Sequence, residues 1–274
     1  TVTVEVLRAG EEEPVELAIR REQIPIDTIL GDTRNADGTW NFTVEGHPEI
    51  GYVRVNAFSG ETAADLRKVL ERLLEEGMQK LVLDLRDDPG GLLDAAIEIS
   101  DMFLREGLIV SVRRRDDTET YSATQRDTLP DFPMVVLVNQ NSASASEIVA
   151  ACLKDHGRAK IAGQRTYGKG TVQQVIDLEA GQGALKLTTA GYWRPSGRNI
   201  NRKLDSTDAD DWGVRPSPGL EVELDQEEFA RLRAWRLRRG VPNENGAAAP
   251  NDEDADFADR QLQRAVEYLL ETEP

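Results

Sequence analysis

The sequence predicts an α/β fold in which helices are layered on a β-sheet. Short apolar runs typical of buried strands, such as 80–86 and 133–138, alternate with segments whose apolar residues recur at helical spacing, such as 144–156. This alternation favours a layered α/β arrangement. The chain has 274 residues, 39% of them hydrophobic, which is enough to bury the core of one main domain with appendages.

The elements of the main domain, which we expect to occupy residues 23–225, begin at residue 51. Apolar periodicity, together with glycine and proline positions, predicts where each element starts and stops. In order, these are strand 51–57, helix 62–77, strand 80–86, helix 91–105, strand 108–114, strand 133–138, helix 144–156, strand 159–162, and strands near 171–177 and 183–193.

Residues 1–22 are predicted to form a hairpin. Thr1–Leu7 and Pro14–Arg20 both alternate like strands, and a polar turn separates them. The sequence starts without methionine and without a basic-then-apolar signal segment.

The last 50 residues are predicted to contain two helices joined by a linker. The run 226–240 is highly charged, which favours a solvated helical arm, with a partner-binding surface as the alternative. Residues 241–256 have the composition of a flexible linker. Residues 257–272 are predicted to be an amphipathic helix that docks on another surface, because apolar residues recur at helical spacing at Leu262, Ala265, Val266 and Leu269.

Composition excludes several classes of function. The formal net charge of −17 disfavours nucleic acid, whose phosphates would be repelled. No stretch approaches the roughly 20 apolar residues of a membrane-spanning helix. Cys152 is the only cysteine, so an internal disulfide is impossible, and its place on an apolar helix face predicts a core residue. With one cysteine and two scattered histidines, we expect neither a metal site nor a cofactor.

Residues 139–174 carry the groups needed for amide hydrolysis without histidine. A serine cluster at a predicted helix start is followed by Lys169, between two glycines, and by Gln173. A serine hydroxyl needs an adjacent base to take its proton. A lysine can be that base only when it is uncharged, and the small and apolar residues around Lys169 predict a buried turn that favours this state. Gln173 lies on the same side as Lys169, where its amide oxygen could hold the lysine without adding a charge.

Ser142, Ser144 and Ser146 compete for the role of nucleophile. A serine at a helix start lies beside free backbone N–H groups that can stabilise an oxyanion. The local pattern by itself favours a plainer interpretation, because Ser144-Ala-Ser-Glu147 fits the S-x-x-E capping box at the start of a helix.

The segment resembles the active-site region of the C-terminal processing (tail-specific) serine peptidases. Their signature is close to SASASE, then D-x-G-R-A, then G-K-G-x-V-Q, and this chain matches each part in order. The resemblance implies that Ser144 is the nucleophile, Lys169 the general base and Gln173 the residue that orients the lysine. Asp155 matches an aspartate that is important in some members.

The resemblance extends over most of the chain. GYVRVNAF at 51–58 is similar to the first core strand of the family, and LVLDLRDDPGG at 81–91 to its LVLDLRNNPGG, with two aspartates in place of asparagines. Aspartate shares the turn preferences of asparagine but adds negative charge. The resemblance implies an oxyanion hole made by the N–H groups of Ala145 and of Gly90 or Gly91. It also implies a ClpP/crotonase-like core, with residues 1–22 as the last strands of a PDZ domain and a C-terminal helical appendage.

These matches imply a serine endopeptidase that cleaves in or near protein C-terminal tails, usually apolar ones. The resemblance also implies a periplasmic or cell-envelope location in a bacterium. The C-terminal helices are candidates for oligomer or adaptor contacts. Three alternatives stay open, namely a non-catalytic module that binds peptides or apolar ligands, an enzyme that is latent without its PDZ portion, and a Ser-Lys amidase.

Overall fold

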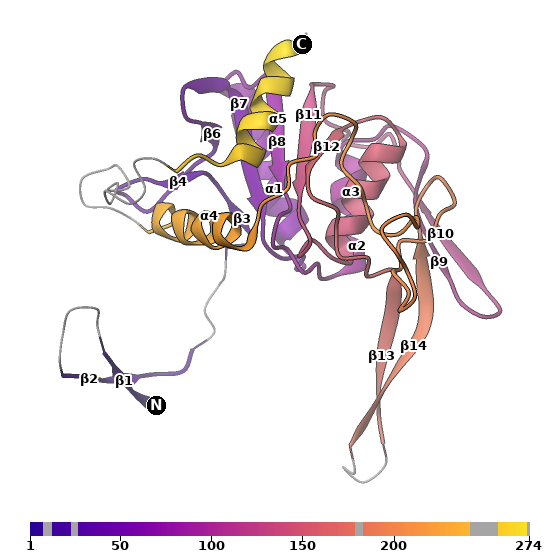
Figure 1. The fold of residues 1–274 in the computed structure, drawn as a ribbon, viewed down its shortest axis with the longest axis horizontal. Coiled ribbons are helices and arrows are strands. Elements are labelled where there is room, and N and C mark those ends of the chain that lie inside the picture. The colour runs from indigo at the N-terminus through magenta and orange to yellow at the C-terminus, as the bar shows by residue number, and fades with distance from the viewer. Residues whose placement is uncertain (8–12, 23–26, 179–182, 242–256, 273–274) are drawn as a thin grey trace.

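A six-stranded sheet forms the centre of the molecule (Figure 1). The computed structural model describes residues 1–7, 13–22, 27–178, 183–241 and 257–272. Strand order in the central sheet is β12, β11, β8, β7, β3, and β6 also pairs with β7. The first four strands are parallel, whereas β3 and β6 run antiparallel to β7. Their bounds are β12 Lys160–Gly163, β11 Met134–Val138, β8 Lys80–Asp84, β7 His47–Val55, β3 Ile29–Leu30 and β6 Thr43–Val44.

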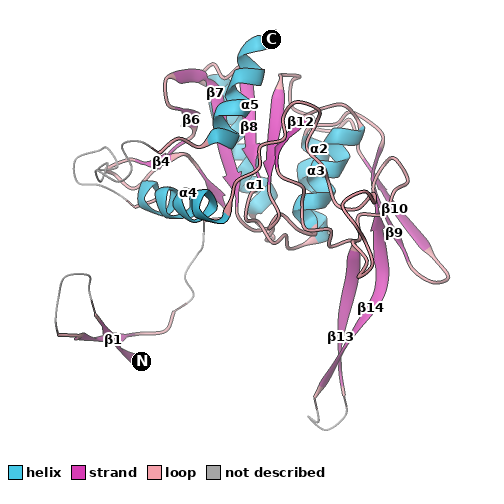
Figure 2. Cartoon of the chain, viewed as in Figure 1, coloured by secondary structure: helices cyan, strands magenta, loops and turns pink. Residues whose placement is uncertain are grey.

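A second, antiparallel sheet has the order β10, β9, β14, β13. Its β13–β14 hairpin extends away from the helices (Figure 2). Two smaller hairpins, β1–β2 and β4–β5, complete the strands. The bounds are β10 Thr118–Ser122, β9 Leu108–Arg113, β14 Ala184–Trp193, β13 Thr171–Asp177, β1 Val2–Val6, β2 Val15–Ile19, β4 Thr33–Arg34 and β5 Trp40–Asn41.

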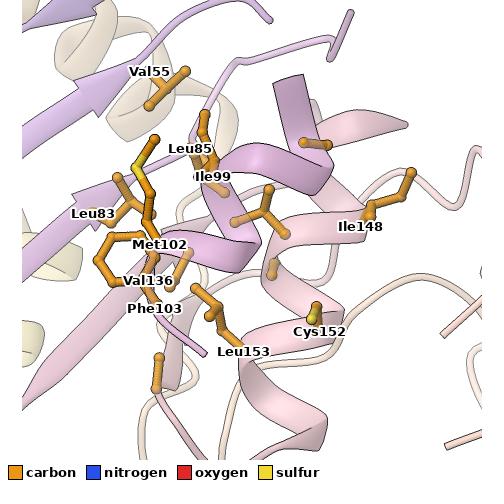
Figure 3. Close-up of a cluster of buried hydrophobic side chains, with 14 of the residues drawn as sticks. Val55, Leu83, Leu85, Ile99, Met102, Phe103, Val136, Ile148, Cys152 and Leu153 are labelled. Carbon is orange, nitrogen blue, oxygen red and sulfur yellow. The ribbon is translucent and has the colours of Figure 1, made fainter. Parts of the chain in front are cut away.

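Helices cover both faces of the central sheet because its strands are apolar on both sides. Alternate residues such as Leu83 and Val136 pack against α1 Thr62–Glu75, α2 Leu93–Met102 and α3 Ala145–Asp155. Val82 and Val135 face the other way and pack with the apolar stripe of α5 Arg260–Glu271. Figure 3 shows part of the first layer, including Ile148 and Cys152 of α3. The result is the layered α/β architecture that the sequence predicts, and no helix in the described ranges has the length and apolar character needed to span a bilayer.

Most predicted elements agree with the structure to within a few residues. Strand β10 is absent from the prediction because its sequence, TETYS, has little apolar content. The N-terminal hairpin forms as predicted, but its division from the rest as a PDZ portion stays a prediction. The linker prediction for 241–256 falls almost wholly outside the described residues.

The prediction of a solvated arm at 226–240 is wrong. Helix α4 Gln226–Arg239 buries Leu232 completely and leaves only 8% of Arg236 exposed. The Arg236 guanidinium lies 2.6 Å from the carboxylate of Asp84, at the end of β8. Local sequence pattern predicts that such a charged helix faces solvent. The buried partner of Arg236, Asp84, lies 152 residues earlier in the sequence, so no local pattern indicates the contact.

Four buried charges join α4 and α5 to the end of β8. Arg86 is fully buried and donates to Asp84 at 2.7 Å and to Asp259, the N-cap of α5, at 2.8 Å. Arg236 adds the second positive charge, so the cluster is balanced. Burial by itself would raise the pKa of Asp84, but Arg236 and Arg86 outweigh it and hold that pKa well below its usual range. The cluster therefore anchors both C-terminal helices to the strand from which the 85–91 turn begins.

Candidate active site

The candidate residues gather where the parallel strands end. Each of β8, β11 and β12 is followed by a loop at the same edge of the sheet, the usual position of sites in open α/β folds. Backbone hydrogen bonds tie these loops together. Ala143 N–H donates to the Asp88 carbonyl at 3.0 Å, and Tyr167 N–H donates to the Ser142 carbonyl at 3.0 Å. The loops that carry the serines, the glycine pair and the lysine are therefore held as one unit.

Ser144 sits at the N-cap of α3 in a strained conformation. Its φ is 57° and its ψ is −113°, a backbone region that non-glycine residues rarely occupy. Strain of this kind costs roughly 1–3 kcal/mol and concentrates at functional sites. The side chain is half-buried, whereas its neighbours on both sides are buried. The fold therefore presents this serine at the surface of the helix start.

The two competing serines are committed to structural bonds. Ser142 is fully buried, and its hydroxyl donates to the Leu85 carbonyl at 2.8 Å. Ser146 is also fully buried and donates to the Asp88 carbonyl at 3.0 Å. Both hydroxyls hold the 85–91 turn against α3. Of the three candidates, Ser144 is the one available to a ligand.

Glu147 links the serine and the lysine through one buried carboxylate. Its Oε2 atom accepts the backbone N–H of Ser144 at 3.0 Å and that of Lys169 at 2.7 Å. Its Oε1 atom accepts from the Thr166 hydroxyl at 2.5 Å and from Gly168 N–H at 2.7 Å. Burial raises the pKa of Glu147, and the four hydrogen bonds oppose that rise. A single oxygen atom thus holds the backbones of both candidate catalytic residues.

Local pattern revealed only half of this role. The capping box predicts that Glu147 reaches back to Ser144 N–H, and it does so. The bonds to Gly168 and Lys169 cross 21 and 22 residues of sequence and have no local signature. The one available signal was the charge itself, since a glutamate in a helix as apolar as α3 needs partners for its carboxylate.

Lys169 is exposed, which contradicts the predicted buried turn. Its neighbours Gly168 and Gly170 are buried, but the lysine side chain lines an open cleft of about 930 Å³. Gln173, on β13, lines the same cleft and is also exposed. Among the described residues no hydrogen bond joins the Lys169 Nζ atom to Ser144 or to Gln173. The small residues that suggested burial instead allow close backbone packing, since a Cβ at Gly170 would lie 2.2 Å from Asn201 N.

Two candidate oxyanion donors, Ala145 and Gly90, lie beside Ser144, and the third, Gly91, packs against Phe58. Ala145 is the first residue of α3, so its N–H has no acceptor within the helix. Gly90, at φ 92°, packs directly on this segment, because a Cβ there would lie 2.8 Å from Ala145 N. Its own N–H, however, donates to the Asp88 carboxylate at 2.8 Å. Gly91 N–H has no acceptor within the described part of the chain, which favours Gly91 over Gly90 as the second donor.

Asp88 is an unusual acid for this position. It is fully buried, its Oδ1 atom accepts Gly90 N–H, and its Oδ2 atom has no hydrogen-bond partner among the described residues. Burial raises the pKa of Asp88 to about 7. The residue therefore takes up a proton on folding at mildly acidic pH.

Replacing Asp88 by asparagine is expected to stabilise the fold increasingly as pH rises. Between the ordinary pKa of 3.8 and the folded pKa of about 7, the native protein keeps a proton that the unfolded chain releases. The unfolding free energy of the wild type should therefore fall across this window and level off above it. Asparagine has no such proton. The unfolding free energy of Asp88→Asn, relative to that of the wild type, should therefore rise by roughly 2–4 kcal/mol between pH 4 and pH 8.

Urea unfolding at several pH values measures this difference. Asp116→Asn, in the exposed turn between β9 and β10, is the matched control and should show no comparable gain. Parallel pH dependence of the wild type and Asp88→Asn would contradict the assignment of a buried proton to Asp88.

Asp155 does not join the site. It lies at the last turn of α3, at the opposite end from Ser144. Its carboxylate accepts from the Arg194 guanidinium at 2.5 and 2.9 Å and from Ser196 N–H at 3.1 Å. Burial would raise the pKa of Asp155, but Arg194 outweighs it and lowers the pKa. The structure thus shows Asp155 fastening the loop after β14 to α3, and a supporting role for it in the chemistry stays a prediction.

Comparison with known proteins places the chain in a family. Residues 49–216 match the model of peptidase family S41. A carboxy-terminal-processing protease of Bartonella bacilliformis is 40% identical over 228 residues, which are 81% of this chain and 47% of that protein. A carboxyl-terminal-processing protease of Synechocystis sp. is 36% identical over 73% of this chain and 45% of that protein. The chain therefore spans about half the length of these curated relatives.

A solved structure shows the same relationship. The photosystem II D1 C-terminal processing protease superposes with a TM-score of 0.59 and 30% identity, covering 89% of this chain and 61% of that one. The family match spans the central sheet from β7, the three loops at its edge and the second sheet. The chain belongs to peptidase family S41.

Proposed function

We propose that the chain is the catalytic part of a serine endopeptidase that cleaves in or near protein C-terminal tails, with Ser144 as nucleophile and Lys169 as general base. The observation that carries this proposal is the shared Glu147 oxygen, which holds the backbones of both residues next to one cleft. The commitment of Ser142 and Ser146 to buried bonds supports the choice of Ser144. The names of the relatives support the choice of C-terminal tails.

In this mechanism an extended peptide lies in the cleft and the Ser144 hydroxyl attacks one of its carbonyl carbons. The uncharged Lys169 amine takes the hydroxyl proton and returns it to the leaving amine. The N–H groups of Ala145 and Gly91 receive the negative charge that develops on the carbonyl oxygen. The lysine is exposed in the free protein, so a bound peptide must displace its water, which favours the uncharged amine. Water then hydrolyses the acyl-enzyme with Lys169 as base again.

Strand β13 is suited to hold the peptide. It is the outer strand of its sheet, so its free edge can accept another strand. It begins two residues after Lys169 and carries Gln173 at a bulge. In our proposal a bound peptide orders the Gln173 amide against the lysine, and this contact forms only on binding.

The hairpin β1–β2 is proposed to be the end of a PDZ domain. Five apolar side chains on the two strands are exposed, namely Val2, Val6, Val15, Leu17 and Ile19, and these strands pair only with each other among the described elements. An isolated two-stranded hairpin is marginally stable in water, so such strands need further packing partners. A periplasmic or cell-envelope location and adaptor contacts through the C-terminal helices stay predictions from the family resemblance.

One observation favours a second candidate, a latent enzyme. Lys169 is exposed and has no hydrogen bond to Ser144 among the described residues, so the base is not in place in the free structure. A segment that closes over the cleft would supply the missing shielding. In that case a longer protein that includes the PDZ domain should be more active than this chain.

The test is proteolysis of a denatured protein combined with active-site labelling. Casein is incubated with the chain, and mass spectrometry identifies the new termini. A fluorophosphonate probe is applied in parallel, and peptide mapping locates the modified residue. We expect new casein termini and a probe on Ser144. Intact casein together with unlabelled Ser144, for both this chain and the longer protein, would reject the proposal.

A further inference from the structure

We propose that the cleft selects peptides by their carboxylates, either acidic side chains or the free C-terminal carboxylate, through the cationic rim Lys186, Arg202 and Arg233. This inference rests on the proposed function, because it names the substrate class of the same cleft. The three residues come from β14, from the loop that follows it and from α4, and all three line the cleft that contains Lys169. Residues from three separate parts of the chain thus meet around one cavity.

The charge of the rim is opposite to that of the whole molecule. The chain carries 50 acidic and 33 basic residues, for a formal charge of −17. The cleft reverses this balance, with five cationic side chains against a single lining carboxylate, Asp87. A local field of opposite sign inside a cavity draws complementary ligands toward it, even when the rest of the surface repels them. An anionic peptide is therefore attracted to this cleft despite the negative charge of the whole chain.

The one acidic group in the cleft is already engaged. The Asp87 carboxylate accepts from Asn141 Nδ2 at 2.8 Å and lies 3.5 Å from the Arg236 guanidinium. By contrast, Lys186, Arg202 and Arg233 form no ion pair with a carboxylate in the described ranges. Lys203 also lines the cleft, but it borders a neighbouring cavity with three aspartates, so we leave it out of the rim. The positive charges of the rim are therefore available to bind a ligand carboxylate.

Arg202 is held in place before any ligand binds. Its guanidinium lies 4.4 Å from the centre of the Trp212 ring, and Arg165 packs on the same indole at 3.4 Å. Its backbone N–H donates to the Gly168 carbonyl at 2.8 Å, directly before Lys169. A planar guanidinium fixed in this way can bind a carboxylate with little loss of side-chain freedom. Arg202 thus ties carboxylate binding to the turn that carries the base.

Calorimetry with four peptides tests the inference. The protein is Ser144→Ala, which leaves the rim unchanged and prevents cleavage. The probes are one alanine peptide containing glutamates and its counterpart containing glutamines, each made as a free acid and as a C-terminal amide. We expect glutamate, a free C-terminus or both to tighten binding about 10-fold at low salt, and the gain to shrink to about 2-fold at 0.5 M NaCl.

Two variants separate the rim from general electrostatics. Lys186→Gln combined with Arg202→Gln, added to Ser144→Ala, should remove the preference for carboxylates. Lys186→Gln with Arg233→Gln repeats the test without disturbing the stacking on Trp212. The control, Lys160→Gln, removes an exposed lysine on β12, outside the cleft, and should leave the preference intact.

The outcomes distinguish this inference from the proposed function. A gain from glutamate alone assigns the rim to acidic side chains, and a gain from the free acid alone assigns it to the C-terminus; both support the inference. Equal affinity for all four peptides, no binding of any, or a preference that survives both rim variants would overturn it. Casein cleavage by the wild type with no carboxylate preference would leave the proposed function standing. Carboxylate-selective binding without any casein cleavage would support the inference about the rim and contradict the proposed peptidase function.

Discussion

Lys169→Ala is expected to lower kcat/KM for peptide cleavage by about 10³- to 10⁴-fold, with the fold intact. General-base catalysis contributes up to this much, and neither histidine is placed to substitute for the lysine. His156 caps the far end of α3 and bonds to the Leu108 carbonyl, and His47 bonds to Glu49. Because the Lys169 side chain is exposed, its removal should leave the melting temperature within a few degrees of the wild type.

The variant Lys169→Arg tests whether Lys169 acts as a general base or only as a positive charge. Arginine keeps the charge and the reach, but it does not lose its proton under ordinary conditions, so this variant should be as inactive as alanine. Lys68→Ala, which removes an exposed lysine on α1, is the matched control and should keep full turnover. The measurement is steady-state hydrolysis of a quenched fluorescent peptide. Wild-type rates in Lys169→Arg would show that the lysine acts only through its charge.

Arg86→Ala is expected to destabilise the fold by about 3–5 kcal/mol, the largest stability effect predicted for this protein. The substitution removes one positive charge from a fully buried cluster and leaves two carboxylates with Arg236 alone. Removing one partner of a buried ion pair carries this cost because the remaining charge stays out of water. The loss should also loosen α5, whose N-cap Asp259 depends on Arg86.

Urea unfolding followed by circular dichroism measures the change. The control is Arg105→Ala, whose ion pair with Asp131 is exposed and spans 3.4 Å. Its cost should stay below about 1 kcal/mol, as for most surface pairs. Equal costs for the two substitutions would mean that the buried cluster does not hold the C-terminal helices.

The parts of the fold that sequence predicted are those with a local signature. Apolar runs gave β8 and β11, and helical spacing gave α3 and α5, because burial imposes a period of 2 or 3.6 on neighbouring residues. The assignment of Ser144 and Lys169 as catalytic residues rests on a resemblance carried by short motifs and stays a proposal. These predictions needed no knowledge of which segments meet in space.

Most features that the sequence analysis missed involve partners far apart in the chain. Arg86 and Asp259 are separated by 173 residues, and neither has a neighbour in sequence that announces the pair. Arg236 was assigned to solvent for the same reason. Asp155 was matched to the family without a partner, and its partner Arg194, in the loop after β14, lies 39 residues later in the sequence. Lys169 was assigned to a buried turn because small neighbours indicate close backbone packing, which does not say where a long side chain goes.

The hydrogen bonds of Glu147 restrict which residue types can occupy position 147 in homologous chains. All four groups around its carboxylate offer hydrogens, so the position accepts only a side chain that offers none. Glutamine has the same outline, but its NH₂ group would meet other hydrogens head on. Under the proposed function, a homologous chain that retains the serine and the lysine yet carries glutamine here is expected to be inactive. The residue at this position therefore distinguishes homologues that are expected to be active from those that are expected to be inactive.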